Sequence, residues 1–199
     1  MKQTIWRVDN PRTIGGRPVR VVGSPRVIDT PQGPAVQFDG RGDQLIIDAN
    51  PLEGAAAFTL EAVFRPDSGG APEQRFVHIQ QADCDDRILL ETRLAPAGRW
   101  YADTFIRSNG RQVPLNDPAL LHDLDQWHTM ALVCDGREMV QYVDGRRELS
   151  AGIDYAPQRV GQVSLGARIN RVWWFKGAIR LLRFTAAALP ADRLLRVTP

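Results

Sequence analysis

Short runs in which apolar and polar residues alternate make up most of the chain, and Gly-, Pro- or Asp-containing turns separate them. The clearest stretch is residues 126–149, QWHTMALVCDGREMVQYVDGRREL, in which two Asp-Gly pairs each lie between apolar, β-prone runs. Asp-Gly suits a two-residue hairpin turn, because both central positions need positive φ, which glycine accepts freely and aspartate tolerates. This stretch predicts a three-strand meander that includes residues 129–134 and 138–143.

The same pattern continues on both sides of the meander. Further strands are predicted at residues 5–9, 19–22, 26–29, 44–47, 59–64, 75–80, 88–94, 99–107, 162–169 and 172–175, with the last two forming a hairpin around Asn170-Arg171. Helical signals are limited to a turn near residues 118–122 and one short helix at residues 190–195, where Pro190 suits the first turn. Many short strands with regular turns predict an all-β fold, a two-sheet antiparallel β-sandwich with one short C-terminal helical turn.

Length and composition fit one sandwich domain over residues 1–199, since all-β sandwiches often reach this length without dividing. Hydrophobic residues make up 43% of the chain, which is enough for a two-sheet core. The net charge is +2, and 23 of the 25 basic residues are arginines spread among acidic residues. A nucleic-acid binder usually clusters its basic residues, so we expect no nucleic-acid partner.

No apolar run approaches the length that spans a membrane, so we expect no membrane insertion. The first residues, MKQTIWRVDNP, lack the apolar centre of a signal peptide. Cys84 and Cys134 are too few for a disulfide framework. Cys134 lies on a predicted core strand, which favours a buried thiol. Nothing in the sequence fixes the oligomeric state.

Three segments, in order, carry a family resemblance. Trp127-His128 followed by Asp135-Gly136 and Tyr142-Val143-Asp144-Gly145 is similar to the central hairpin of laminin-G-like jelly-roll domains, in the concanavalin A-like lectin/glucanase superfamily. Residues 35–47 with 58–64 resemble its opening strands, and residues 175–184 resemble its closing strand. The resemblance implies a jelly roll, an extracytoplasmic location, and a first strand paired with the last. Trp6 would then pack near residues 179–184.

Strand parity predicts a polar face, because side chains two residues apart on a strand stand on the same surface. The sets are Phe76, His78 and Gln80; Glu91 and Arg93; Tyr101, Asp103, Phe105 and Arg107; and Gln162, Ser164 and Arg168, with Gln141 from the meander. If these strands are neighbours, the face offers guanidinium, carboxylate, amide and aromatic groups, which suit the hydroxyls and C–H faces of a sugar. The alternative is a solvated face that carries its own ion pairs.

The resemblance implies that the concave sheet is the ligand face. The leading hypothesis is therefore a non-catalytic module that binds a polysaccharide or other glycan. Trp173 is a further candidate. It and Trp174 are adjacent, so on a strand they would point to opposite sides and one of them would leave the core. An exposed tryptophan near the polar face could stack on a sugar ring. The candidate ligand-binding residues are His78, Gln80, Glu91, Arg93, Tyr101, Asp103, Arg107, Arg168 and Trp173.

Two alternatives stay open. An enzyme acting on polysaccharide would use Glu91 and Asp103 as the two carboxyls of a glycoside hydrolase, or His78 and Tyr101 in a lyase. The glucanase motif that the resemblance implies, Glu-x-Asp-x-x-Glu, is absent. The other alternative is a structural or protein-interaction domain, whose polar face would be occupied by its own ion pairs and loops.

The resemblance also implies a calcium site between the aspartate of the opening Phe-Asp-Gly segment and an aspartate of the closing strand. Calcium takes several oxygen ligands, and Asp39 and Asp43 are present. The closing position corresponds to Arg180, whose guanidinium cannot ligate a cation. We therefore expect no cofactor, and an ion pair between Arg180 and Asp39 or Asp43; these two aspartates would hold calcium only if the site survives.

Overall fold

The computed structural model describes residues 2–197, which form 17 strands and one 3-10 helix. The residues Met1, Thr198 and Pro199 of the predicted domain lie outside this range. In chain order the elements are β1 Gln3–Arg7, β2 Thr13–Ile14, β3 Arg17–Val22, β4 Arg26–Ile28, β5 Ala35–Asp39, β6 Gln44–Ile47, β7 Phe58–Pro66, β8 Glu73–Gln81, β9 Arg87–Ala95, β10 Arg99–Ser108, β11 Arg111–Asn116, β12 His122–Asp123, β13 His128–Cys134, β14 Glu138–Val143, β15 Arg146–Gly152, β16 Gly161–Leu165, β17 Lys176–Thr185 and η1 Ala191–Arg193.

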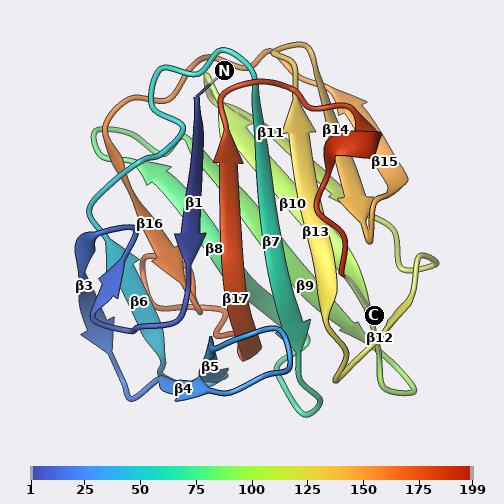
Figure 1. Cartoon of the computed structure of the whole chain (residues 1–199). Helices are drawn as coiled ribbons and strands as arrows, with labels where there is room; N and C mark the ends of the chain where they lie inside the picture. The colour runs from blue at the N-terminus through green and yellow to red at the C-terminus, as the bar shows by residue number, and fades with distance from the viewer. Residues whose placement is uncertain (1, 198–199) are drawn as a thin grey trace.

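Two antiparallel sheets face each other, as Figure 1 shows. The first sheet, nearer the viewer, has the order β15-β14-β13-β7-β17-β5-β4, and β1 also pairs with β17. The second sheet, behind it, has the order β11-β10-β9-β8-β16-β6-β3-β2, and β12 also pairs with β10. The prediction of a two-sheet antiparallel sandwich is confirmed, and η1 is the short turn expected near the C-terminal end. No helix in the described part of the chain is long and apolar enough to cross a membrane.

The core fills the space between the sheets with aromatic and aliphatic side chains. Phe64 of the first sheet stacks on Phe76 of the second with ring centroids 4.2 Å apart, and Trp100 and Phe175 are fully buried beside them. At one end Trp6 meets Phe184 edge-on at 4.9 Å. Because β1 pairs with β17 over Gln3–Arg7, the expected pairing of the first strand with the last is confirmed. Cys134 is a buried free thiol, as expected.

The two Asp-Gly turns of the meander differ. At Asp144-Gly145 both residues have positive φ, 49° and 71°, as a two-residue hairpin turn requires. At Asp135-Gly136 only the glycine does, with φ of 99°. There the loop includes Arg137, and the Asp135 carboxylate accepts the backbone N–H groups of Arg137 and Glu138 at 2.8 and 2.7 Å. The prediction of a two-residue turn is wrong at this position, because strand pairing resumes one residue later.

The predicted hairpin of residues 162–169 and 172–175 is also wrong. Strand β16 ends at Leu165, and residues 166–175, here called the 166–175 loop, are closed by a hydrogen bond from Phe175 N to the Gly166 carbonyl at 2.8 Å. Gly166, Arg171 and Trp173 all have positive φ, which interrupts a strand. Residues 118–122 likewise form a turn and the start of β12 instead of a helical turn.

Candidate functional site

The strands predicted to carry the polar residues are neighbours in the second sheet, in the order β16, β8, β9 and β10, and β11, which was not predicted, follows β10. Their outward side chains form one surface, here called the polar face, while Ile79, Ile88, Ile106 and Val163 point from the same strands into the core.

Cross-strand register divides this surface into rows. The basic row is Gln162, Gln80, Arg87, Arg107 and Gln112. The middle row is Ser164, His78, Leu89, Phe105 and Pro114. The two carboxylate rows are Arg75, Glu91, Asp103 and Asn116, then Glu73, Arg93 and Tyr101.

Two residues expected on the polar face lie elsewhere. A β-bulge between Arg75 and Val77 turns Phe76 into the core, so that Arg75 takes its place on the surface. Gln141 belongs to the other sheet and is buried there, donating to Glu148 at 3.0 Å. Arg168 and Trp173 come from the 166–175 loop instead of a strand.

Arg75, Arg87 and Gln112 were missing from the predicted set. Arg87 has the same parity as Leu89, Glu91 and Arg93, so the expected strand began one residue too late to include it. Gln112 faces Arg107 across the β10–β11 hairpin, which was not predicted; the Ser108-Asn109-Gly110 turn is the sequence signal that could have found it. For Arg75, only the bulge reveals the correct parity.

The carboxylate rows form a network of buried ion pairs. Arg93 contacts Glu73, lies 2.7 Å from Asp103 and 3.7 Å from Glu91, while Arg75 lies 3.0 Å from Glu91. Glu91 and Asp103 are each only 2% exposed. Burial, and then the neighbouring Asp103 charge, raise the pKa of Glu91 to about 7, and burial also raises the pKa of Asp103. These carboxyls are therefore held against guanidinium groups beneath the surface, where a glycosidic oxygen has no access to them.

The His78 side chain is likewise inaccessible from the surface. Its side chain is fully buried, and its Nδ1 accepts the backbone N–H of Ile169, in the 166–175 loop, at 3.0 Å. Burial, followed by the charges of Arg168, Arg87 and Arg75, lowers the pKa of His78 to about 3. It is a neutral imidazole beneath a loop, which is unsuited to taking a proton from a substrate on the surface.

The basic row is more open, and it leads to two shallow hollows. Arg87 lies over the Phe105 ring at 5.0 Å, and Arg107 reaches the exposed Asp85 at 3.4 Å. Gln162 lines a hollow of about 330 Å³ between β3, β6 and β16, and a second of about 280 Å³ beside Gln80, Val160 and Ile169. Tyr101 and Phe105 are half-buried rings on the same face, and Trp173, 42% exposed, covers Arg75 at 4.9 Å.

The larger hollow, about 610 Å³, lies around the predicted calcium position and is lined by Asp39, Asp43, Asp67 and Lys176 among others. Asp39 Oδ1 accepts the backbone N–H groups of residues 41–43, and both Asp43 oxygens accept backbone N–H groups. Lys176 is the residue opposite Asp39 on β17. Within residues 2–197 no group of three or more His, Cys, Asp or Glu side chains is arranged to hold a metal ion.

Arg180 does not pair with either aspartate, and that prediction is wrong. Its Nη1 donates to the Gln32 carbonyl at 3.0 Å, and burial together with the nearby Arg7 lowers its pKa. The register explains the difference, because Lys176 and not Arg180 lies across from Asp39. The carboxylates are instead satisfied by backbone donors.

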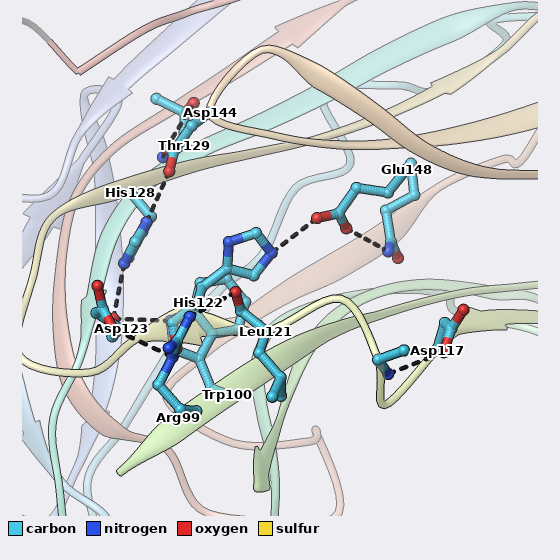
Figure 2. Close-up of polar contacts among 12 residues, drawn as sticks. Arg99, Trp100, Asp117, Leu121, His122, Asp123, His128, Thr129, Asp144 and Glu148 are labelled. Atoms are coloured by element: carbon cyan, nitrogen blue, oxygen red, sulfur yellow. Dashed lines mark hydrogen bonds and ion pairs between the residues drawn. The ribbon is translucent and has the colours of Figure 1, made fainter. Parts of the chain in front are cut away.

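A second polar cluster, unpredicted by the sequence, lies where β10 and β12 meet β13 and the β14–β15 hairpin (Figure 2). His122 Nε2 lies 2.7 Å from Glu148, and His128 Nδ1 lies 2.8 Å from Asp144, and Trp100 packs against both imidazoles. Trp100 Nε1 donates to the Asp123 carbonyl at 3.1 Å. These contacts join the sheets and fix the hairpin turn, which is a structural role for His128.

Three comparisons place this geometry among known proteins. A family model described as the concanavalin A-like lectin/glucanases superfamily matches residues 39–194. A search of curated proteins found no match. Among solved structures, domain 4 of AbnA, a GH43 extracellular arabinanase from Geobacillus stearothermophilus in complex with arabinotriose, gives a TM-score of 0.68 at 18% identity and covers 96% of both chains.

Two other solved structures match over part of their length. The binding domain of botulinum neurotoxin DC in complex with SialylT gives a TM-score of 0.65 at 10% identity, covering 96% of this chain and 49% of that one. The K499G mutant of NanB sialidase from Streptococcus pneumoniae gives 0.62 at 20% identity, covering 79% and 26%. The chain thus spans about half of the neurotoxin domain and a quarter of the sialidase. At these identities the likeness shows the fold.

Proposed function

Because the chain belongs to the concanavalin A-like lectin/glucanases superfamily, we propose that it is a non-catalytic glycan-binding module whose ligand lies on the polar face. The observation that carries this proposal is the composition of that face. Five adjacent strands present planar hydrogen-bonding side chains together with the half-buried rings of Tyr101 and Phe105. Amide and guanidinium groups pair with sugar hydroxyls, and aromatic rings pack against sugar C–H groups.

The comparisons add support of a general kind. The solved structures include one in complex with arabinotriose and one in complex with SialylT, both on the same fold as this chain. One fold hosts many functions, so the ligand here has to be argued from the site. The two shallow hollows beside Gln162, about 330 and 280 Å³, offer space of the size that a small sugar needs.

A hydrolase or lyase is a weaker proposal for this face. The two candidate carboxyls, Glu91 and Asp103, are buried and share Arg93, and the candidate base His78 lies under the 166–175 loop. The ion-paired carboxylate rows favour a second candidate, a structural or protein-interaction domain in which the face only stabilises the sandwich. That candidate accounts for the carboxylate rows but not for the open basic row.

A glycan array followed by calorimetric titration tests the proposal. We expect at least one polysaccharide to bind, and Tyr101→Ala and Arg107→Ala each to weaken binding by about tenfold. Arg146→Ala, an exposed arginine on β15 of the opposite sheet, is the matched control and should bind as the parent chain does. Absence of binding to any polysaccharide, or equal binding by all three variants, would favour the structural candidate.

A further inference from the structure

We propose that the basic row is a subsite for an anionic group, a carboxylate or a sulfate ester, carried by the glycan that the polar face binds. This inference rests on the proposed function and narrows its ligand to acidic saccharides. Figure 1 places the strands that build the row, β16, β8, β9, β10 and β11, side by side in the rear sheet.

The row contains donors and like charges but no carboxylate. Arg87 and Arg107 are direct cross-strand partners, flanked by Gln80 and Gln162 on one side and by Gln112 on the other. Like charges directly opposite each other destabilise an antiparallel pair. Burial, and then the nearby charges of Arg168 and Arg107, lower the pKa of Arg87, which is the same repulsion seen as a titration shift. The fold therefore carries a cost at this place that a bound anion would remove.

Donor atoms in this region have no acceptor in the described part of the chain. The Nε atoms of Arg87, Arg107 and Arg168 are buried and make no hydrogen bond within residues 2–197. A buried donor without an acceptor costs free energy, and a charged donor costs more than a neutral one. A carboxylate or sulfate supplies several acceptor oxygens and matches the planar fork of a guanidinium, often with two parallel bonds.

In the carboxylate rows of the same face, Arg93 is an arginine whose charge is met by the protein, although Nε and Nη1 of its neighbour Arg75 make no hydrogen bond within residues 2–197. Arg93 there contacts Glu73, Glu91 and Asp103, so its charge is fully engaged by the protein. The acid that pairs with Arg107 of the basic row is Asp85, which lies outside the row in a surface loop. The two side chains are 3.4 Å apart, and the Asp85 side chain is 65% exposed. The exposed geometry of this pair makes it weak and displaceable. The acid beside the basic row is therefore far more exposed than Glu91 and Asp103, which pair with Arg93.

The row is also held in position before any ligand arrives. The guanidinium of Arg87 lies over the Phe105 ring at 5.0 Å, and its Nη1 donates to the Asp85 carbonyl at 3.0 Å. Gln162 is fixed by Asp48 at 2.7 Å. Side chains that are already ordered lose less entropy on binding. The hollow of about 280 Å³ is lined by Gln80, Gln162 and Asp48 among others, and Gln80 is the cross-strand partner of Arg87, so the hollow lies beside the row.

Calorimetric titration with three oligosaccharides of equal length tests the inference: an oligogalacturonate, a heparin-derived sulfated oligosaccharide and a neutral galacto-oligosaccharide. We expect one of the anionic probes to bind at least about tenfold more tightly than the neutral one. Arg87→Gln and Arg107→Gln keep donors and remove charge, so each should lower affinity for that anionic probe by about tenfold. Affinity for the neutral probe should change less than twofold or so. The carboxylate and sulfate arms identify which anion the row prefers.

Arg146→Gln on the opposite sheet is the matched control. If it weakens anion binding as much as Arg87→Gln does, the attraction is only that of net charge and the inference fails. If the neutral probe binds as tightly as both anions and the row variants change nothing, the inference fails while the proposed function stands. If a full glycan array shows no binding at all, both fail.

Thermal unfolding gives a readout independent of affinity. Because Arg87→Gln relieves repulsion, its unfolding midpoint should equal or exceed that of the parent chain, and the anionic probe should no longer raise it. A midpoint that falls by several degrees in Arg87→Gln would show that the arginine stabilises the free protein, and would overturn the inference.

Discussion

At the scale of single residues, Glu91 is a carboxyl whose environment opposes its charge. Burial and the Asp103 charge act against ionisation, and Arg75 and Arg93 act for it, with a net rise of the pKa from its usual 4.5 to about 7. A group whose pKa is raised on folding stabilises the protein fully below its unfolded pKa, and this contribution is lost as pH rises through the folded pKa. The window for Glu91 is therefore about pH 4.5 to 7.

The prediction is that Glu91→Gln gains stability relative to the parent chain as pH rises. Between pH 5 and pH 8 the difference in unfolding free energy should move by about 2 kcal/mol in favour of the variant. Urea denaturation at a series of pH values measures it. Glu138→Gln, on the exposed surface of the first sheet, is the control variant. A flat profile for Glu91→Gln would show that the ion pairs dominate and that the pKa is not raised.

Asp144 performs two roles in the meander, visible in Figure 2. One oxygen lies 2.8 Å from His128 Nδ1, and the other accepts the backbone N–H of Thr129 at 2.8 Å. Burial acts to lower the pKa of His128, but the hydrogen bonds to Asp144 and to the Asp123 carbonyl outweigh it, so the pKa is raised. A raised histidine pKa stabilises the fold at low pH, and this contribution is lost as pH rises through the folded pKa.

Asp144→Asn removes the charge and keeps a residue that tolerates the φ of 49°. We expect the pKa of His128 to fall in an NMR titration, and the protein to lose about 1 kcal/mol of stability at pH 5 to 6, with a smaller loss at pH 9. Asp135→Asn is the control, since the Asp135 carboxylate accepts backbone N–H groups of its own turn. An unchanged His128 pKa in Asp144→Asn would refute this assignment.

At the scale of elements, two local irregularities build the polar face. The bulge at Phe76 sends that ring into the core and gives its surface place to Arg75. The 166–175 loop then brings Arg168 and Trp173 to the face and covers His78. Gly166 starts this loop with φ of 84°, and a Cβ there would come within 2.2 Å of the Phe38 ring.

Gly166→Ala should therefore cost more than about 2 kcal/mol of unfolding free energy, from backbone strain and from the displaced ring together. We also expect faster hydrogen exchange at the Ile169 amide, because its bond to His78 depends on the loop. Gly98→Ala is the control: its φ is 68° but the space around it is open, so it should show the strain alone. Equal losses in the two variants would contradict the role of Phe38 contact.

At the scale of the whole molecule, one large hydrophobic core fills the space between the two sheets and contains buried residues of both, such as Phe64 and Phe76. The prediction of a single domain over residues 1–199 follows: calorimetry should show one transition that coincides with the loss of far- and near-UV circular dichroism.

The midpoint of this unfolding transition should be unchanged by millimolar calcium or by a chelator, because Asp39 and Asp43 accept backbone N–H groups and Lys176 lies opposite Asp39. Two transitions would contradict the first expectation, and a midpoint that rises several degrees with calcium would contradict the second.

The sequence by itself determined the class of fold and most of the strands. Alternation of apolar and polar residues has the same period as a strand, and Asp-Gly and Pro/Gly turns limit where strands end, so the meander was predictable from the residues alone. The pairing of the first strand with the last was predicted only from the family resemblance. The same parity identified Glu91, Arg93, Tyr101, Asp103 and Arg107 as residues of one surface. These are local properties, and local patterns carry them.

Only the tertiary structure decided which of those residues are free to act. Arg93 pairs with carboxylates, whereas Arg87 forms no ion pair within residues 2–197. This difference depends on which strands are neighbours and in what register, and such contacts join residues that can lie far apart in the chain. The bulge at Phe76 is fixed by a ring that stacks across the sheets on Phe64, and Gly166 turns the chain where Phe38 leaves no room for a side chain. Lys176 in place of Arg180 opposite Asp39 is likewise a matter of register. All of these features depend on contacts between residues far apart in the chain, and a periodic pattern in the sequence does not specify such contacts.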